Sequence, residues 1–405
     1  MSSSDYYQKG FGLKSAIQAT LRRDYHSALV VRVRDGGSCL HAGDLTIRLA
    51  QEFGFCYGVD RAVEYAYETI EKFPDRRVFL TGEIIHNPHV NDRLREMGIR
   101  FLSQDGSEAA LPADIGPGDV VILPAFGVPA PIFAELKDRG CVLVDTTCGS
   151  VLNVWKNVER YAARGFTSII HGKYDHEETR ATASRAMMYP DGRYLIVRDM
   201  DQTELVCDHI SRAGMADRAA FLARFEKAAS PGFDPDRHLD RLGLANQTTM
   251  LSSESLAIAG RLRRALVEQY GEKDLDTRFL SFDTICSATQ DRQDAVMRLV
   301  REGVDLLLII GGYNSSNTNH LASIGALNVP TYHINSAGCI SGPGAIRHKP
   351  FGSKEEIETR AWLPPGIVRV GVTAGASTPN VMIGEVIESL LQCRGLTLES
   401  IGLAP

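Results

Sequence analysis

Three cysteines occupy the same kind of position, between an apolar strand pattern and an amphipathic helix pattern. Asp-Thr-Thr-Cys ends at Cys148, Asp-Thr-Ile-Cys ends at Cys286, and a third, less similar copy surrounds Cys56. A helix N-terminus carries partial positive charge, so it lowers the pKa of a thiol and favours a metal-binding thiolate. A single strand-end cysteine is more often a small buried apolar residue. Three in matching contexts predict a metal centre.

An iron–sulfur cluster suits these cysteines better than zinc does. Zinc sites usually use closely spaced cysteine pairs, and these three cysteines are far apart in the chain. A four-iron cluster with three protein thiolates keeps one iron open, which can act as a Lewis acid toward a substrate oxygen. The remaining cysteines lack the pattern and are expected to be ordinary thiols of a reducing cytoplasm: Cys39, Cys141, Cys207, Cys339 and Cys393.

Polar loops at other strand ends supply further candidates. Residues 171–179 follow an apolar run and contain two histidines and two adjacent glutamates, and His86 ends a loop before a helix pattern. Residues 311–317 and 374–379 are small polar turns that lead into helices, where backbone N–H groups and hydroxyls can bind phosphate oxygens. Each turn taken alone is equally well explained as a helix cap. Together they predict an anion site at the strand ends.

The elements that must position these residues alternate between strands and helices, which predicts an α/β fold. We expect strands at residues 45–49, 78–80, 120–123, 168–170, 306–310 and 368–373, and a β-prone run at residues 28–33. Three successive modules each open near one cysteine, so the simplest assembly directs their strand–helix junctions toward a common centre. The expected divisions are an accessory extension (1–44), a first module (45–147), a second with a helical insertion (148–280) and a third with a surface insertion at 341–365 and a C-terminal strand–helix unit (281–405).

Composition excludes several classes of function. The 405 residues carry a formal net charge of −6 from interspersed acids and bases, which does not indicate a nucleic-acid or membrane surface. No window holds about eighteen uninterrupted apolar residues, and the first residues lack a leader-like pattern. We therefore expect a cytoplasmic protein that acts on a small molecule.

The motifs together resemble the 4-hydroxy-3-methylbut-2-enyl diphosphate reductase family from about residue 45 to the C-terminus. Lys-Gly-Phe-Gly at 9–12 and the insertions are similar to its cyanobacterial and plastid-type branch. The motifs that carry the resemblance are 53–62 (Phe-Gly-Phe-Cys-Tyr-Gly-Val-Asp-Arg-Ala), 85–87 (Ile-His-Asn), 145–148, His176 with Glu178, 247–249 (Gln-Thr-Thr), 283–289, 314–317 (Asn-Ser-Ser-Asn) and 372–377 (Val-Thr-Ala-Gly-Ala-Ser).

The resemblance implies a trefoil-like arrangement of the three modules around a four-iron four-sulfur cluster with one open iron. The cluster ligands would be Cys56, Cys148 and Cys286. The implied reaction is the last step of the non-mevalonate isoprenoid route, in which two electrons and two protons convert the substrate to isopentenyl and dimethylallyl diphosphates. Ferredoxin or flavodoxin is the implied electron donor. Glu178, His176 and Thr248 would be catalytic, and substrate would be bound by His86, His176, Thr248, Ser315, Ser316, Asn317 and Ser377.

The chain departs from the family pattern at two positions. Phe126 stands where many shorter bacterial members have a histidine, and Gly149 stands where a proline commonly follows the second cysteine. Glu177 lies beside Glu178, and the spacing to Thr182 favours Glu178 as the acid.

Two other functions remain open at this point. An iron–sulfur hydro-lyase acting on a small phosphorylated substrate would use the same open iron without external electrons. A non-enzymatic iron–sulfur redox sensor would explain three thiolates but not the anion loops.

Overall fold

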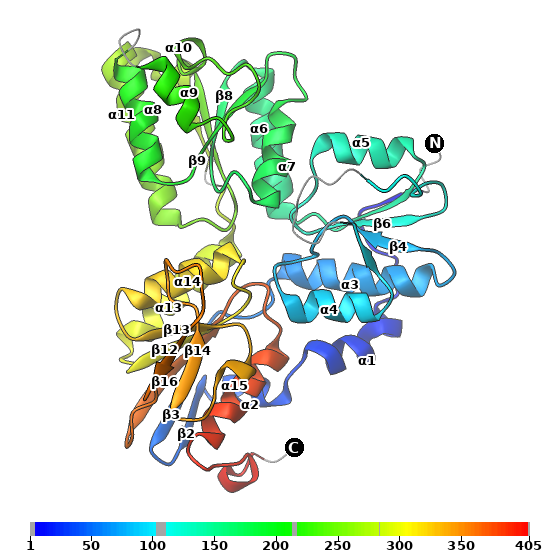
Figure 1. Cartoon of the computed structure of the whole chain (residues 1–405), viewed down its shortest axis with the longest axis vertical. Helices are drawn as coiled ribbons and strands as arrows, with labels where there is room; N and C mark the ends of the chain where they lie inside the picture. Colours follow the sequence, from blue (N-terminus) through cyan, green and yellow to red (C-terminus); the bar gives the residue numbers. More distant parts are fainter. Residues whose placement is uncertain (1–4, 103–110, 213–216, 283, 404–405) are drawn as a thin grey trace. The chain divides into compact units, whose positions relative to one another are not determined.

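The computed structural model describes residues 5–102, 111–212, 217–282 and 284–403 (Figure 1). Asp283, part of the motif at Cys286, lies outside the described residues. The chain divides into two compact units. Unit 1 comprises Met1–Lys9, Asp75–Ile84 and Gly98–Cys286, and unit 2 comprises Gly10–Pro74, Ile85–Met97 and Ser287–Pro405.

Unit 1 contains two parallel sheets within its described part. The first has the order β1-β7-β6-β4-β5, and its strands are Tyr6–Tyr7, Val142–Asp145, Val120–Leu123, Val78–Leu80 and Arg100–Phe101. Its buried residues include Phe79, Val121 and Leu143, which pack against Leu136 of α5 (Ala130–Asp138). Continuous apolar strands of this kind are typical of parallel sheets buried on both faces.

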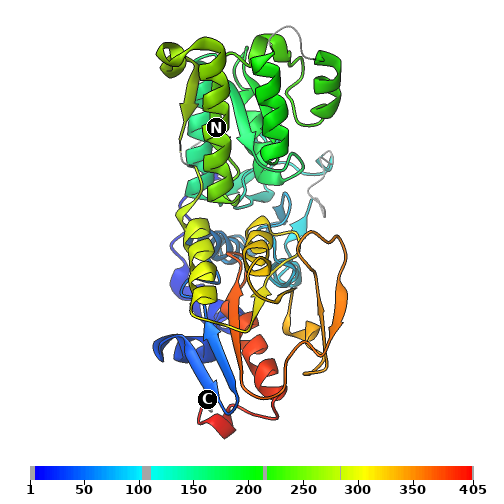
Figure 2. The same ribbon diagram turned by 90° about the vertical axis from the view of Figure 1, so that its left-hand side faces the viewer.

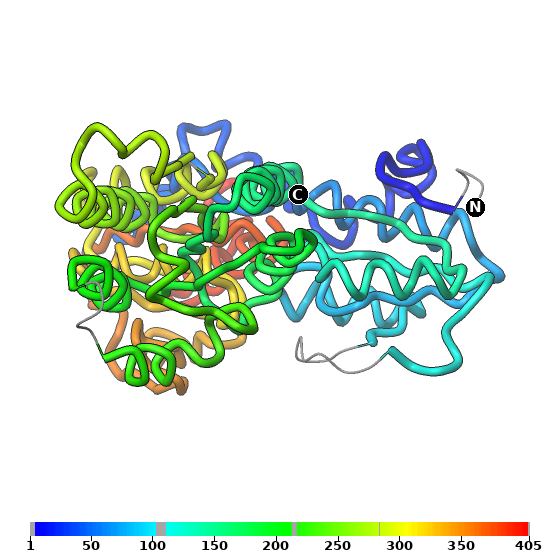
Figure 3. Tube along the Cα trace, turned by 90° about the horizontal axis from the view of Figure 1, so that it is seen from above, coloured from blue at the N-terminus to red at the C-terminus, as the bar shows by residue number. Residues whose placement is uncertain are grey.

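The second sheet of unit 1 has the order β11-β10-β8-β9. Its strands are Phe279–Ser281, Leu242–Asn246, Thr167–His171 and Arg193–Val197. One core forms against α8 (Met200–Ser211), α9 (Arg218–Arg224) and α11 (Ser252–Tyr270), of which α8 and α11 run side by side (Figure 3). Another core forms with α6 (Gly149–Ala163) and α7 (Glu177–Ala186). Short helices α10 (Pro235–His238) and α12 (Leu275–Arg278) complete this part.

Unit 2 is built on one sheet that joins the two ends of the chain (Figure 2). Its order is β13-β12-β16-β3-β2, with strands Thr331–Ile334, Leu306–Ile310, Val368–Ala374, Leu45–Leu49 and Cys39–Ala42, of which only β2 is antiparallel to its neighbour. The helices are α1 (Lys14–Tyr25), α2 (Ala28–Asp35), α3 (Tyr57–Lys72), α4 (Pro88–Glu96), α13 (Ser287–Arg301), α14 (Ser316–Ala326) and α15 (Asn380–Gln392). A hairpin is formed by β14 (Ala345–His348) and β15 (Ile357–Arg360).

The expected α/β fold with parallel sheets is confirmed, and most strands occupy the predicted positions. The prediction of a β-prone run at residues 28–33 is wrong, because this segment lies in α2. Leu29, Val30 and Val33 form a buried helical face, and the Ser27 hydroxyl accepts the Val30 N–H as an N-cap. Packing against α15 therefore overrides the strand preference of the valines.

Two further segments contribute to the sheets and the core. The extension at 1–44 supplies β1 to a sheet of unit 1 and β2 to the sheet of unit 2. The segment 341–365, expected to lie on the surface, buries Ile346, Trp362 and Leu363 in the core of unit 2. The strand at 45–49 pairs with β16, so the sheets do not follow the linear division into modules. No helix of the described residues is long and apolar enough to cross a membrane.

Candidate functional site

Two of the three cysteines cap helices, and the third directly precedes one. Cys56 is the N-cap residue of α3, Cys148 is the N-cap residue of α6, and Cys286 immediately precedes α13 in the chain. All three are partly buried. These positions fit thiolate ligands, because the helix N-terminus stabilises negative charge and partial burial limits access of water. Cys56 belongs to unit 2, whereas Cys148 and Cys286 belong to unit 1, so their convergence on one cluster stays a prediction.

Hydrogen bonds fix the turn that presents Cys148. The Thr147 N–H and hydroxyl both donate to Oδ1 of Asp145, at 2.9 and 2.5 Å, and the Tyr6 hydroxyl donates to Oδ2 of Asp145 at 2.6 Å. The Cys148 N–H donates to the carbonyl of Ala125. Asp145 and Tyr6 are therefore positioning residues that the sequence analysis did not single out. The repeated Asp-Thr-x-Cys motif was a signal for Asp145, but no sequence signal connected Tyr6 to it.

The acid cluster, defined as His176, Glu178 and Thr248, lies within unit 1. The Thr248 N–H donates to Oε1 of Glu178 at 2.5 Å, and the Thr248 hydroxyl lies 3.0 Å from Oε2. Glu178 is 1% exposed and Thr248 is 5% exposed. A buried carboxylate needs such donors to offset the loss of water. The structure therefore brings the predicted acid and its predicted threonine partner together.

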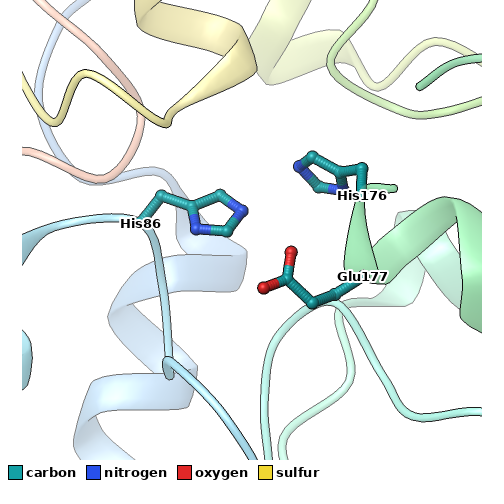
Figure 4. Close-up of side chains that lie close together, drawn as sticks. All are labelled: His86, His176 and Glu177. Carbon is teal, nitrogen blue, oxygen red and sulfur yellow. The ribbon is translucent and has the colours of Figure 1, made fainter. Parts of the chain in front are cut away.

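His176 and Glu177 begin the α7 helix beside this carboxylate. His176 is the N-cap residue, and its Nδ1 accepts the Glu178 N–H at 3.2 Å, so a neutral ring carries its proton on Nε2. Figure 4 shows His176 and Glu177 projecting from the start of α7. Glu177 is only partly buried, and the bonds to Thr248 involve Glu178. The carboxylate that Thr248 holds is therefore that of Glu178, and its role as the acid stays a prediction.

Phe126, which stands where many family members have a histidine, packs against His176 in unit 1. Its ring meets the His176 ring edge to face, with centroids 5.5 Å apart. An aromatic pair of this geometry restricts the orientation of the imidazole. The residue that replaces the family histidine thus contacts a predicted catalytic side chain directly.

The loop that contains Gln247 and Thr248 links the acid cluster to Cys286 by hydrogen bonds. Gln247 accepts the Lys173 N–H and the Thr179 hydroxyl through Oε1, each at 3.1 Å. The Cys286 N–H reaches the carbonyl of Thr248 at 3.4 Å. Thr248 therefore contacts Glu178 with its side chain and the Cys286 backbone with its carbonyl.

The anion cluster, defined as His86, Ser315, Ser316, Asn317 and Ser377, lies within unit 2. Ser315 is the N-cap residue of α14, and Ser316 and Asn317 form its first turn. The Ser377 hydroxyl donates to the backbone carbonyl of His86 at 3.1 Å, and the His86 side chain extends from the loop before α4 (Figure 4). A Cβ on Gly312 would lie 2.6 Å from that same carbonyl, so this close approach of the loops requires glycine.

Asn317 carries a buried donor that no described residue accepts. Its Oδ1 accepts the Ala376 N–H at 3.0 Å, while Nδ2 has no hydrogen-bond partner among the residues that the structure describes. The residue is only 2% exposed. An unpaired buried amide is costly, and at a helix N-terminus this donor could bind an anion. The Ala376 carbonyl in turn accepts the Cys56 N–H at 3.2 Å, which places the Cys56 backbone next to this cluster.

Two asparagines that sequence reasoning did not assign hold the anion cluster together. The Asn87 amide donates to the carbonyl of Ser377 at 2.8 Å, and the Asn314 amide lies 3.4 Å from Nδ1 of His86. Asn87 and Asn314 lie in the motifs 85–87 and 314–317 that carry the family resemblance, so these motifs could have identified them.

Comparison with known proteins places these clusters in a family context. A family model described as LytB protein matches residues 47–391. The chain belongs to the LytB family. The LytB chain is 50% identical to a 4-hydroxy-3-methylbut-2-enyl diphosphate reductase of Gloeobacter violaceus, over 98% of this chain and 94% of that protein. A protein of the same name from Thermosynechococcus vestitus is 48% identical over 98% of this chain and 97% of its own length.

A solved structure supports the fold of this LytB protein. The structure of (E)-4-hydroxy-3-methyl-but-2-enyl diphosphate reductase, the terminal enzyme of the non-mevalonate pathway, matches with a TM-score of 0.52 at 27% identity. The match covers 85% of this chain and 99% of that chain. The family resemblance predicted from the motifs is thus confirmed, including the similarity to cyanobacterial members.

Proposed function

We propose that this LytB protein reduces 4-hydroxy-3-methylbut-2-enyl diphosphate to isopentenyl and dimethylallyl diphosphates. The observation that carries the proposal is the buried Glu178 carboxylate, held by two donors of Thr248 beside His176. Removal of an allylic hydroxyl requires a proton for the departing oxygen, and a positioned carboxyl group can supply it. Near-full-length relatives that carry this reductase name support the same reaction.

The anion cluster supports recognition of the diphosphate. Ser315, Ser316 and Asn317 offer hydroxyl, backbone and amide donors at a helix N-terminus, and Asn317 Nδ2 needs an acceptor. Ser377 and His86 extend the set of donors on the neighbouring loops. These contacts act in both the ground state and the transition state, so their main effect is on KM. We propose that this cluster binds the phosphates and leaves the allylic end for the acid cluster.

Cys56, Cys148 and Cys286 would hold a four-iron four-sulfur cluster in a trefoil-like arrangement of three α/β modules. Thiolates at helix N-termini are suitable donors for such a group. When bound, the cluster would supply electrons and a Lewis-acidic iron. Ferredoxin or flavodoxin is the proposed source of electrons.

Roles at the reacting end follow from contacts within unit 1. Thr248 keeps Glu178 oriented, and its hydroxyl can pass a proton because it bonds Oε2 directly. His176 presents Nε2–H while Nδ1 is occupied by the Glu178 N–H. Phe126 packs edge to face on the imidazole and restricts its orientation. Together they keep the proton source in one orientation.

The decisive experiment combines metal analysis with product analysis. Protein purified without oxygen should contain about four irons and four sulfides per chain. It should form both diphosphate products only when a reductant is supplied. Conversion of the substrate without reductant would favour the hydro-lyase, and an intact cluster without any turnover would favour the redox sensor.

A further inference from the structure

A cavity of about 670 Å³ lies within unit 2, where the N-terminal extension meets the beginning of α3. Helix α1 packs on α3 there (Figure 1). Lys14, Arg22, Tyr25 and Arg34 come from the extension and line the cavity. The substrate-binding residues proposed above are not among the lining residues, so the cavity is separate from the anion cluster.

The residues on both sides of a proposed cluster ligand line the cavity. Phe55 and Tyr57 flank Cys56, and both line the cavity. Tyr57 is 82% exposed, so its ring is open to contact by a partner. Tyr25 of the extension packs against Phe55 with ring centroids 5.6 Å apart. A partner seated here would therefore touch the segment that holds Cys56.

The lining of the cavity carries an excess of positive charge. The lining has more cations than acids, although the whole chain has a net charge of −6. Lys14 and Glu64 form an ion pair with each other at 2.9 Å, so these two residues add no net charge to the lining. The cations that line the cavity are Lys14, Arg22, Arg34, Arg61 and Arg292, and the acids are Glu52, Asp60 and Glu64.

Two arginines of the lining lie over aromatic rings, an arrangement that interfaces use. Arg34 lies over the Phe53 ring at 4.5 Å and Arg61 lies over the Tyr65 ring at 5.6 Å, so both guanidinium groups are backed by aromatic faces. Arg292 instead donates to the backbone carbonyls of Gly54 and Ala288 and has a structural role. Arginine and tyrosine dominate binding energy at protein interfaces, and complementary charge increases the rate of encounter.

We propose that this cavity, formed by the extension, α3 and the segment around Cys56, docks a small acidic ferredoxin that delivers electrons. The inference rests on the proposed reductase function. Two docking events supply one electron each and leave each ferredoxin oxidised by one electron. The substrate takes up both electrons and two protons, its C–O bond breaks, and water leaves. Weak, transient complexes with small interfaces are typical of such carriers.

The test compares two sources of electrons. Turnover is measured with a reduced acidic two-iron ferredoxin and, separately, with dithionite and methyl viologen, which require no docking. In the double variant Arg22→Glu, Arg34→Glu, we expect kcat/KM for ferredoxin to fall at least about tenfold at low salt, while turnover with the small reductant stays within about twofold. Arg347→Glu with Arg360→Glu makes the same charge change on the exposed hairpin and should leave both rates unchanged.

A binding titration supplies a readout that does not depend on turnover. Oxidised ferredoxin should bind wild-type protein without substrate, more weakly as salt increases, and more weakly still to the double variant. Tyr57→Ser, which alters contact but not charge, should also weaken binding. Unchanged affinity in both, or an equal loss in the hairpin control, would overturn the docking site.

The same data separate the two proposals. If the Arg22→Glu, Arg34→Glu variant is slowed equally with both reductants, the docking site is refuted, because the substitutions would then affect a step other than ferredoxin binding. If wild-type protein fails to turn over with the small reductant, the reductase function is wrong. The titration then still decides whether the cavity binds ferredoxin.

Discussion

Replacing Glu178 with Gln tests the acid cluster most directly. Glutamine can keep one acceptor for the Thr248 N–H and turn its amide toward the Thr248 hydroxyl, which can accept as well as donate. The exchange replaces charge-assisted bonds with neutral ones, so we expect a loss of stability of about 1 kcal/mol. A unit of this size would then show a thermal midpoint lowered by about 2–4 °C. The structural cost is therefore small.

The chemical cost should be much larger. Glutamine has no proton to give at neutral pH, so we expect kcat to fall by about 10²–10⁴ while the cluster content stays intact. The assay is steady-state turnover with an artificial reductant, accompanied by iron and sulfide counts. Glu177→Gln is the matched control and should stay within a few-fold of wild type. Near-normal turnover of Glu178→Gln would refute the role of Glu178 as the acid. If Glu177→Gln were inactive in the same assay, Glu177 would be the acid instead.

Three further outcomes are expected. Cys148→Ser should lose the iron and sulfide of the cluster, whereas Cys39→Ser should retain them, and a full complement with normal turnover in Cys148→Ser would disprove the three-thiolate site. Asn317→Ala should raise KM for the diphosphate about tenfold to a hundredfold with less effect on kcat, whereas exposed Asn328→Ala should not, and a change confined to kcat would remove Asn317 from the anion site. Burial lowers the pKa of His171 from 6.5 to about 4, so as the pH falls the unfolded chain takes up a proton before the folded chain does. The free energy of unfolding should therefore be unaffected by His171 above pH 6.5 and should decrease by up to about 3 kcal/mol as the pH falls toward 4. Chemical denaturation of wild type and His171→Asn across this range should show a shallower pH dependence in the variant.

Local sequence signals were sufficient for the strand ends and helix starts that carry the site. Apolar runs marked β3 and β12 at the observed residues, and helix patterns after Cys56 and Cys148 correctly placed both cysteines at helix N-termini. These features depend on residues close together in the chain, so a single sequence can reveal them. The pairing of Glu178 with Thr248 was predicted only through the family motifs, since seventy residues separate the two.

Features created by distant contacts escaped prediction. The valines of α2 are locally suited to a strand, and only packing against α15 selects a helix. Nothing around Tyr6 indicates that its hydroxyl supports Asp145, 139 residues away. Likewise, the sequence does not reveal that the Ala376 N–H bonds Oδ1 of Asn317 and leaves Nδ2 without a partner among the described residues.

The sheet of unit 2 sets an order of events during synthesis. Strand β3 leaves the ribosome early, but its partner β16 follows roughly 320 residues later. At about 5–20 residues per second, β3 waits for tens of seconds with one edge unpaired, while both sheets of unit 1 can already form. The backbone next to Cys56 is secured by Ala376, which arrives later still. A cluster that needs Cys56 can therefore be completed only after almost the whole chain has been made, and a nascent chain truncated before β16 should accumulate with a folded unit 1 and no stable metal centre.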